Sequence, residues 1–217
     1  MRRLPQYIGN LKHGAWQQSG LKSAAMPPNF SLGQVLRGKV LGIWGYGKIG
    51  RLVAGYGKAF GMHVMIWGSE ASRLKAAGDG FVPAATREAF FEESDVLSLH
   101  LRLADTTRGC VTRQDLARMQ PTALLVNTSR AELVEAGALV AALRDGRPGM
   151  AAVDVYEREP VRDEPLLRLP NVIASPHLGF VERTSYETMF GGAFDNVVAF
   201  AAGEPRNIVN AAALATR

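Results

Sequence analysis

The stretch Lys39-Val40-Leu41-Gly42-Ile43-Trp44-Gly45-Tyr46-Gly47-Lys48-Ile49-Gly50 decides the fold of this chain. Its first half is an apolar run of the right length for a buried strand. Its second half is a G-x-G-x-x-G turn, and apolar residues then recur at helical spacing from Leu52 to Phe60. The sequence therefore predicts a strand, a tight glycine turn and a helix in direct succession.

A glycine turn in this setting is suited to bind a pyrophosphate. The first glycine allows the tight turn, the second lets the backbone approach the phosphates, and the third lets the helix pack closely on the strand. The helix N-terminus offers N–H groups and a positive dipole. Glycine triplets arise by chance in a chain with 23 Gly, so the flanking strand and helix carry this interpretation.

Beyond the turn, the chain alternates between strand and helix patterns without an internal repeat. Strands are expected at 39–44, 63–67, 81–82, 96–101, 123–127, 150–154 and 172–174. Helices are expected at 2–12, 49–60, 87–93, 113–119, 132–144 and 183–202. This alternation predicts an α/β fold with a doubly wound parallel sheet, that is, a Rossmann-type dinucleotide-binding domain. An N-terminal arm and a C-terminal helix are expected to flank this domain.

Composition narrows the class of protein. The 217 residues are 47% apolar and 21% charged, as in ordinary globular domains. No apolar window is long enough for a membrane span, and no apolar segment of a signal peptide follows the N-terminus. The single cysteine, Cys110, excludes an internal disulfide and favours the cytoplasm, and we expect it to be a small buried or half-buried side chain.

The net charge of +5 comes from dispersed arginines rather than from a basic cluster. Nucleic-acid binders usually show a clustered basic face, so we expect no nucleic-acid partner. An anionic cofactor and an anionic substrate suit this charge equally well.

Ligands of open parallel sheets bind at the carboxyl ends of the strands. Arg130, Glu159 and His177 all follow predicted strands and together offer an anion-binding and acid–base set. Each alone is unremarkable, and a lone histidine such as His100 is more often structural than catalytic. Their common edge of the sheet makes them candidate catalytic residues.

Three runs carry a resemblance to a known family: Leu125–Arg130, Asp154–Pro160 and Pro170–His177. They resemble signatures of the D-isomer-specific 2-hydroxyacid dehydrogenases, and 45–50 and 95–103 match that family in order and spacing. The resemblance covers most of residues 35–205. It implies that the protein reduces a small 2-keto acid to a 2-hydroxy acid with NAD or NADP.

The resemblance also implies roles for residues. Arg130 would bind the substrate carboxylate and polarise the keto group, His177 would be the acid–base, and Glu159 would orient His177. No metal is implied. The residues expected at the cofactor, with Asp154 at the nicotinamide carboxamide, are Gly45, Gly47, Lys48, Ile49, Gly50, Ser69, Arg73, Leu101, Arg102, Thr128, Ser129, Asp154 and Gly179.

The choice between NAD and NADP stays open at this stage. NAD-specific sheets place an acidic residue at the end of the second strand. Here Gly68 and Ser69 occupy that place, followed by Glu70 and Arg73. A carboxylate would repel a 2′-phosphate, whereas Ser69 with Arg73 could accept one, which tilts the interpretation slightly towards NADP.

The family resemblance divides the chain into an interdomain helix and dimerisation arm (1–35), a dinucleotide-binding domain (36–180), and a C-terminal helix and tail (181–217). It implies that most of the N-terminal substrate domain is missing here. It also implies a homodimer, in which the arm could bury Trp16 against the partner subunit. A loop that packs back on its own domain would cover Trp16 equally well. The alternative function is a catalytically silent NAD(P)-binding module or sensor.

Overall fold

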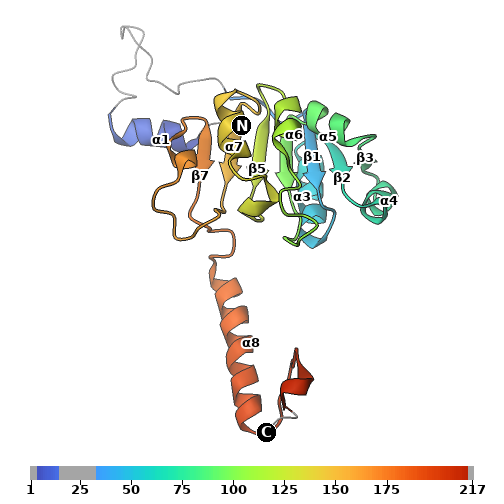
Figure 1. Ribbon diagram of the computed structural model, residues 1–217, viewed down its shortest axis with the longest axis vertical. Helices are drawn as coiled ribbons and strands as arrows, with labels where there is room; N and C mark the ends of the chain where they lie inside the picture. The colour runs from blue at the N-terminus through green and yellow to red at the C-terminus, as the bar shows by residue number, and fades with distance from the viewer. Residues whose placement is uncertain (1–3, 15–32, 215–217) are drawn as a thin grey trace. The chain divides into compact units, whose positions relative to one another are not determined.

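The computed structural model describes residues 4–14 and 33–214 (Figure 1). The chain divides into two compact units, Met1–Pro176 and His177–Arg217. Helix α1 (Leu4–Lys12) is the predicted N-terminal helix, whereas Trp16 and most of the predicted arm lie outside the described residues. None of the described helices combines the length and apolar character that a membrane crossing needs.

The larger unit is built on a parallel sheet, which has seven strands within the described residues in the order β3-β2-β1-β4-β5-β6-β7. The chain places β2 and β3 on one side of β1 and then returns to add the others on the opposite side. The strand order therefore reverses between β1 and β4, which confirms the doubly wound fold. The strands are β1 (Val40–Trp44), β2 (His63–Trp67), β3 (Val82–Pro83), β4 (Val96–Leu99), β5 (Leu124–Asn127), β6 (Met150–Val153) and β7 (Val172–Ala174).

Helices connect the strands of this sheet (Figure 1). The larger unit contains α3 (Lys48–Ala59), α4 (Glu70–Gly78), α5 (Arg87–Glu93), α6 (Arg113–Arg118) and α7 (Ala138–Arg144), with the 3₁₀ turns η1 (Ala131–Leu133) and η2 (Pro165–Arg168). The smaller unit contains α8 (Arg183–Ala201) and η3 (Ala211–Leu214).

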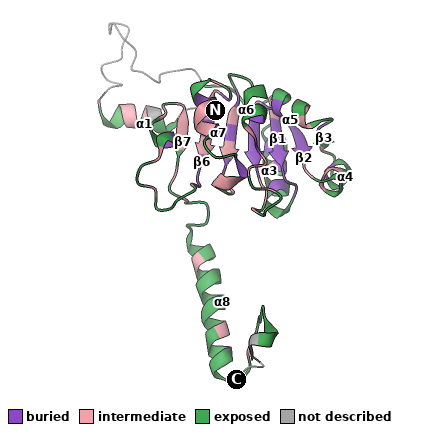
Figure 2. Ribbon diagram, viewed as in Figure 1, coloured by how far each residue is buried: buried purple, intermediate pink, exposed green. Residues whose placement is uncertain are grey.

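Two apolar layers cover the faces of the sheet. Ile43 and Ile66 are fully buried on one face, and Leu97 and Leu99 are fully buried on the other with Phe90. Successive strand residues point to opposite faces, so a strand covered by helices on both sides is apolar throughout. Figure 2 shows this burial along the strands, whereas most of α8 is exposed.

The carboxyl ends of the strands lie in register. Backbone pairing aligns a single row across the sheet: Trp44, Trp67, Leu99, Asn127, Val153 and Ala174. The chain leaves the sheet directly after these residues. The loops that follow the strands therefore start from one edge.

One helix prediction needs correction, and one helix of the structure was not predicted. The helix expected at 132–144 is wrong in its first half, because Val134 pairs with Val111 in a parallel bridge and α7 begins only at Ala138. Gly137, with φ of 72°, takes a left-handed conformation that breaks the helical path. Helix α4 was not predicted, because only Ala76 of its residues is buried and no apolar stripe marks it.

Candidate functional site

The glycine turn after β1 is fixed by close backbone contacts. Gly45 has φ of 105°, and a Cβ there would lie 2.6 Å from the carbonyl oxygen of His100. A Cβ on Gly50 would collide with the carbonyl oxygen of Gly45. In contrast, within the described part of the chain nothing lies within 4 Å of a Cβ on Gly47. The outer glycines thus shape the turn, and the middle one leaves its surface open.

Helix α3 starts directly at this open surface. Gly47 is its N-cap and provides no side chain to cap the first turn, while Lys48 and Ile49 are exposed beside it. The first N–H groups of a helix lack partners within the helix, and the dipole adds positive charge there. The turn therefore offers the N–H groups and the positive charge that a pyrophosphate requires, and the predicted pyrophosphate site stays a prediction.

Tyr46 holds the turn from behind. Its ring is buried and packs edge-on against Phe81, with ring centroids 5.9 Å apart. Its hydroxyl donates a hydrogen bond to Asp79, which also pairs with Arg51 over 3.3 Å. Burial and the neighbouring Asp79 carboxylate raise the pKa of Tyr46, so the hydroxyl remains a donor.

The end of β2 adjoins the same turn. The Gly45 N–H donates to the carbonyl oxygen of Trp67 at 3.0 Å, so the two loops start side by side. Ser69 is the N-cap of α4, and Glu70 is exposed in its first turn. The guanidinium of Arg73 lies over the Trp67 ring, 4.9 Å from its centroid. The loop after β2 therefore starts beside the glycine turn, where Ser69 and Arg73 were predicted to contact the cofactor.

The loop after β5 is organised by the buried side chain of Asn127. Its Oδ1 accepts the Ser129 N–H at 3.1 Å, and its Nδ2 donates to the carbonyl oxygen of Arg130 at 2.8 Å. The Ser129 hydroxyl donates to the Leu99 carbonyl on the neighbouring strand. These bonds fix the backbone that carries the exposed Arg130 side chain.

A cavity of about 380 Å³ opens at the ends of β4 and β5 and at the start of α3. Six of its eight lining residues are predicted site residues: Ile49, Leu101, Arg102, Thr128, Ser129 and Arg130. The structure thus brings together residues that lie up to 81 positions apart, from Ile49 to Arg130. Cofactor and substrate candidates share this cavity.

His100 and Leu103 also line this cavity and were missed as site residues. The Nε2 of His100 is 2.9 Å from the Ser98 hydroxyl, and burial lowers the pKa of His100. The imidazole is therefore neutral near pH 7. Its place at the end of a strand beside the glycine turn was the available signal.

The loop after β6 contains two further predicted residues. Asp154 is buried, and its Oδ1 accepts the Ser175 hydroxyl at 2.5 Å. Glu159 accepts the Tyr156 N–H at 3.1 Å, and the Tyr156 hydroxyl donates to the Ser175 carbonyl at 2.9 Å. Burial raises the pKa of Tyr156 and preserves this donor.

His177 and Gly179 belong to the smaller unit, whereas Arg130 and Glu159 belong to the larger one. His177 has φ of 54°, a left-handed conformation that is uncommon for a residue other than glycine. Its ring packs edge-on against Phe180, with centroids 5.6 Å apart. Such backbone outliers concentrate at functional sites.

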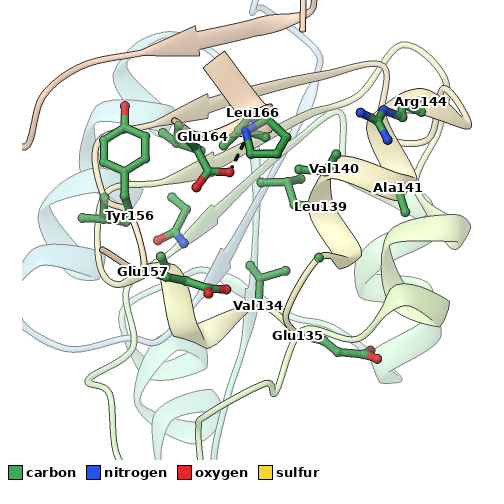
Figure 3. Close-up of a pocket in the computed structure, with 16 residues that line it drawn as sticks. Val134, Glu135, Leu139, Val140, Ala141, Arg144, Tyr156, Glu157, Glu164 and Leu166 are labelled. Atoms are coloured by element: carbon green, nitrogen blue, oxygen red, sulfur yellow. Dashed lines mark hydrogen bonds between the residues drawn. The ribbon is translucent and has the colours of Figure 1, made fainter. Parts of the chain in front are cut away.

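A second cavity, of about 370 Å³, lies beside α7 and η2 (Figure 3). Apolar side chains such as Leu139 line it, together with Arg144, Glu157 and Glu164, whose carboxylate accepts the Leu166 N–H. None of the predicted site residues lines this cavity. Among the described residues, no group of three or more His, Cys, Asp or Glu is placed to hold a metal ion.

Known proteins resemble this chain over most of its length. The family model for the NAD-binding domain of D-isomer specific 2-hydroxyacid dehydrogenases matches residues 1–179. A glyoxylate reductase from Aeropyrum pernix is 43% identical over 185 residues, which cover 84% of this chain and 55% of that protein.

Solved structures agree with this match. An oxidoreductase structure from Ralstonia solanacearum is 60% identical with a TM-score of 0.89, covering 96% of this chain and 61% of that one. A phosphoglycerate oxidoreductase from Vibrio cholerae is 55% identical with a TM-score of 0.85, covering 93% and 62%. The chain thus spans between 55% and 62% of the length of these three proteins.

Proposed function

This chain belongs to the D-isomer-specific 2-hydroxyacid dehydrogenase family, and from that premise we propose that it is the cofactor-binding part of an NAD(P)-dependent oxidoreductase acting on a small 2-keto or 2-hydroxy acid. One observation carries the proposal. The cavity beside the glycine turn joins Ile49, expected at the pyrophosphate, to Arg130, expected at the substrate carboxylate.

The residues of the glycine turn fit a nicotinamide dinucleotide. The open surface at Gly47 allows a pyrophosphate to approach the first N–H groups of α3, and a side chain larger than hydrogen would fill that space. Asp154, buried and bonded to the Ser175 hydroxyl, is proposed to face the carboxamide. Once bound, the cofactor supplies the hydride chemistry.

The chain's own residues supply binding and proton transfer. We assign Arg130 to the substrate carboxylate, because a planar guanidinium matches a carboxylate with two parallel hydrogen bonds. The exposed side chain of Arg130 at the cavity supports this assignment. His177 is assigned as the acid that protonates the keto oxygen, and Glu159 as the carboxylate that orients it; both roles rest on the family signature.

The test is to add NADH or NADPH with glyoxylate, hydroxypyruvate or pyruvate, and to follow the absorbance of the reduced nicotinamide. Oxidation that depends on the keto acid supports the enzyme. Cofactor binding without oxidation by any of these acids supports the silent binding module instead. Failure to bind either cofactor contradicts both.

We also propose that the protein is a homodimer assembled through the dinucleotide-binding domain and the arm at 1–35. Leu52, Tyr56 and Phe60 form a helical stripe on α3 and are 60%, 60% and 62% exposed, which supports a partner surface. Light scattering should give twice the chain mass, and Leu52→Glu should shift the mass towards the monomer. A wild-type monomer would contradict the dimer.

The proposed location is the cytoplasm. Cys110 is half-buried, one of the two expected states, and burial raises the pKa of its thiol, so it has the character of an unreactive structural side chain. Fractionation of cells producing the tagged protein tests this location.

A further inference from the structure

We propose that Asn127 is a positioning residue for the part of the site that binds the keto acid: its side chain holds Arg130 in place, while its backbone holds Asp154. This role rests on the proposed function, because Arg130 must bind a substrate carboxylate for its position to matter. Asn127 is not among the described residues that line the cavity with Arg130, so it acts through Arg130 rather than on the substrate itself.

Asn127 is a polar side chain that is buried in the sheet. It is the last residue of β5, and only 2% of its surface is exposed. An amide loses its hydrogen bonds to water on burial, and this loss costs free energy unless both of its ends find partners in the protein. The burial of Asn127 therefore requires a specific set of hydrogen bonds.

Both ends of this amide bind the backbone of the loop that follows β5. Asn127 Oδ1 accepts the Ser129 N–H at 3.1 Å, and Nδ2 donates to the Arg130 carbonyl oxygen at 2.8 Å. One side chain thus fixes the peptide group before Ser129 and the peptide group after Arg130. Because the backbone is held on both sides, the direction in which the Arg130 side chain leaves the loop is fixed as well.

The same loop is held at a second point, on the neighbouring strand. The Ser129 hydroxyl donates to the Leu99 carbonyl oxygen at 3.0 Å, and Leu99 is the β4 residue that pairs with Asn127. Arg130 Nη1 donates to the Ser129 carbonyl oxygen at 2.6 Å. A guanidinium has five N–H donors, so others remain for a ligand in the cavity. None of the described residues that line this cavity is acidic, so no carboxylate there competes for Arg130.

The backbone of Asn127 serves the cofactor part of the site. Its carbonyl oxygen accepts the Asp154 N–H at 3.1 Å, directly after the end of β6. Asp154 is the residue proposed to face the nicotinamide carboxamide. This bond involves no side-chain atom of Asn127, so it survives a substitution at 127 that keeps the strand. Loss of the side chain should therefore impair binding of the keto acid and spare binding of the cofactor.

The experiment compares Asn127→Leu with the wild type, both as the whole chain. Leucine keeps the approximate size of the side chain and removes both hydrogen bonds to the loop, so kcat/KM for an active keto acid should fall at least about tenfold. Calorimetry with oxamate, an unreactive analogue of a 2-keto acid, on the cofactor complex should show a loss of affinity of the same size. The dissociation constant of the cofactor should stay within about twofold, which also shows that the variant is folded.

Asn171→Leu is the matched control. Asn171 Nδ2 also donates to two backbone carbonyl oxygens, those of Leu143 and Gly149, both at 3.1 Å. Asn171 directly precedes β7, so it lies at the edge of the parallel sheet opposite to the carboxyl ends of the strands. Asn171→Leu should lose stability in urea as Asn127→Leu does, whereas its kcat/KM and its oxamate affinity should stay within about twofold of the wild type.

Asn127→Asp is a second variant, which also serves if the leucine variant does not fold. It keeps the shape of the side chain and the acceptor for Ser129 but loses the donor to the Arg130 carbonyl, so it should lose kcat/KM and oxamate affinity at least about tenfold as well. Unchanged keto-acid constants, a parallel loss of cofactor affinity, or equal losses in Asn171→Leu would overturn the role of Asn127. If the wild type neither turns over a keto acid nor binds oxamate, the proposed function itself fails, and this role fails with it.

Discussion

The Tyr46 hydroxyl donates a hydrogen bond to Asp79 Oδ2 over 2.8 Å, and this bond joins the glycine turn to the end of α4. Tyr46 is only 5% exposed, so its ring and hydroxyl are both fixed. Tyr46 thus fixes the backbone that would bind a pyrophosphate, although its side chain lies behind the turn and would not contact the pyrophosphate itself. Preorganisation of this kind lowers the cost of binding.

Tyr46→Phe should destabilise the protein by about 1 kcal/mol, because a part-buried hydrogen bond is lost and the ring is kept. Urea unfolding measures the change, and Tyr56→Phe on the exposed side of α3 is the control. Cofactor affinity should fall with stability, since the turn is less firmly held. A Tyr46→Phe protein as stable as wild type would show that the hydroxyl plays no part.

The second and third glycines of the turn, Gly47 and Gly50, should respond differently to alanine. Gly50→Ala meets the Gly45 carbonyl and should cost about 3 kcal/mol of stability, as overpacking against backbone does. Gly47→Ala meets nothing among the described residues, so it should fold normally and lose cofactor affinity by about tenfold or more. Thermal unfolding and calorimetric binding separate the two effects. Normal binding by folded Gly47→Ala would contradict the proposed pyrophosphate position.

The ion pair between Arg87 and Asp115 should make the stability of the fold sensitive to acid. Arg87 Nε and Nη2 contact the two oxygens of Asp115 at 2.9 and 2.5 Å, while Arg87 lies over Trp44. Burial alone would raise the pKa of Asp115, but the hydrogen bonds from Arg87 and Thr112 outweigh burial and lower it. The ion pair therefore contributes its full stabilisation above the unfolded pKa of Asp115, about 3.9. This stabilisation is lost as the pH falls through the lower pKa that Asp115 has in the folded state.

Asp115→Asn should cost about 2 kcal/mol at pH 7, where a charged and hydrogen-bonded group is removed. The difference in stability between the variant and the wild type should narrow as the pH falls below the unfolded pKa of about 3.9 and through the lower pKa of the folded state. Urea unfolding across this pH range is the measurement. Asp145→Asn, in an exposed pair with Arg113, should cost less than about 0.5 kcal/mol at any pH. A gap that stays constant into acid would argue against the ion pair.

His177→Ala should lower turnover by at least about 10²-fold while NADPH affinity stays within about twofold, because general-acid catalysis is lost and the glycine turn is untouched. Steady-state rates with an active keto acid and calorimetric binding are the two measurements. His63→Ala, at an exposed position at the start of β2, is the control. Unchanged turnover in His177→Ala would refute its assignment as the acid.

Local patterns predicted the elements well where burial is periodic. The run Lys39–Trp44 and the stripe that follows it gave the strand, turn and helix, and β2 and β7 have the predicted bounds. Prediction failed where burial is weak, as in α4, or where backbone conformation intervenes, as at Gly137. The spacing of apolar residues does not reveal a helix with a single buried residue, and it does not reveal a residue with a left-handed backbone conformation.

Local sequence patterns were sufficient to predict the fold class, the glycine turn and the identity of the strand-end residues, because these depend on neighbours within a few positions. Only the tertiary structure decided which of them meet. Register across the sheet aligns Trp44, Leu99 and Asn127, and so places Ile49, Leu101 and Arg130 around one cavity. The Tyr46–Asp79 bond and the Arg73–Trp67 contact also depend on packing, since pairing between distant segments has no local signature.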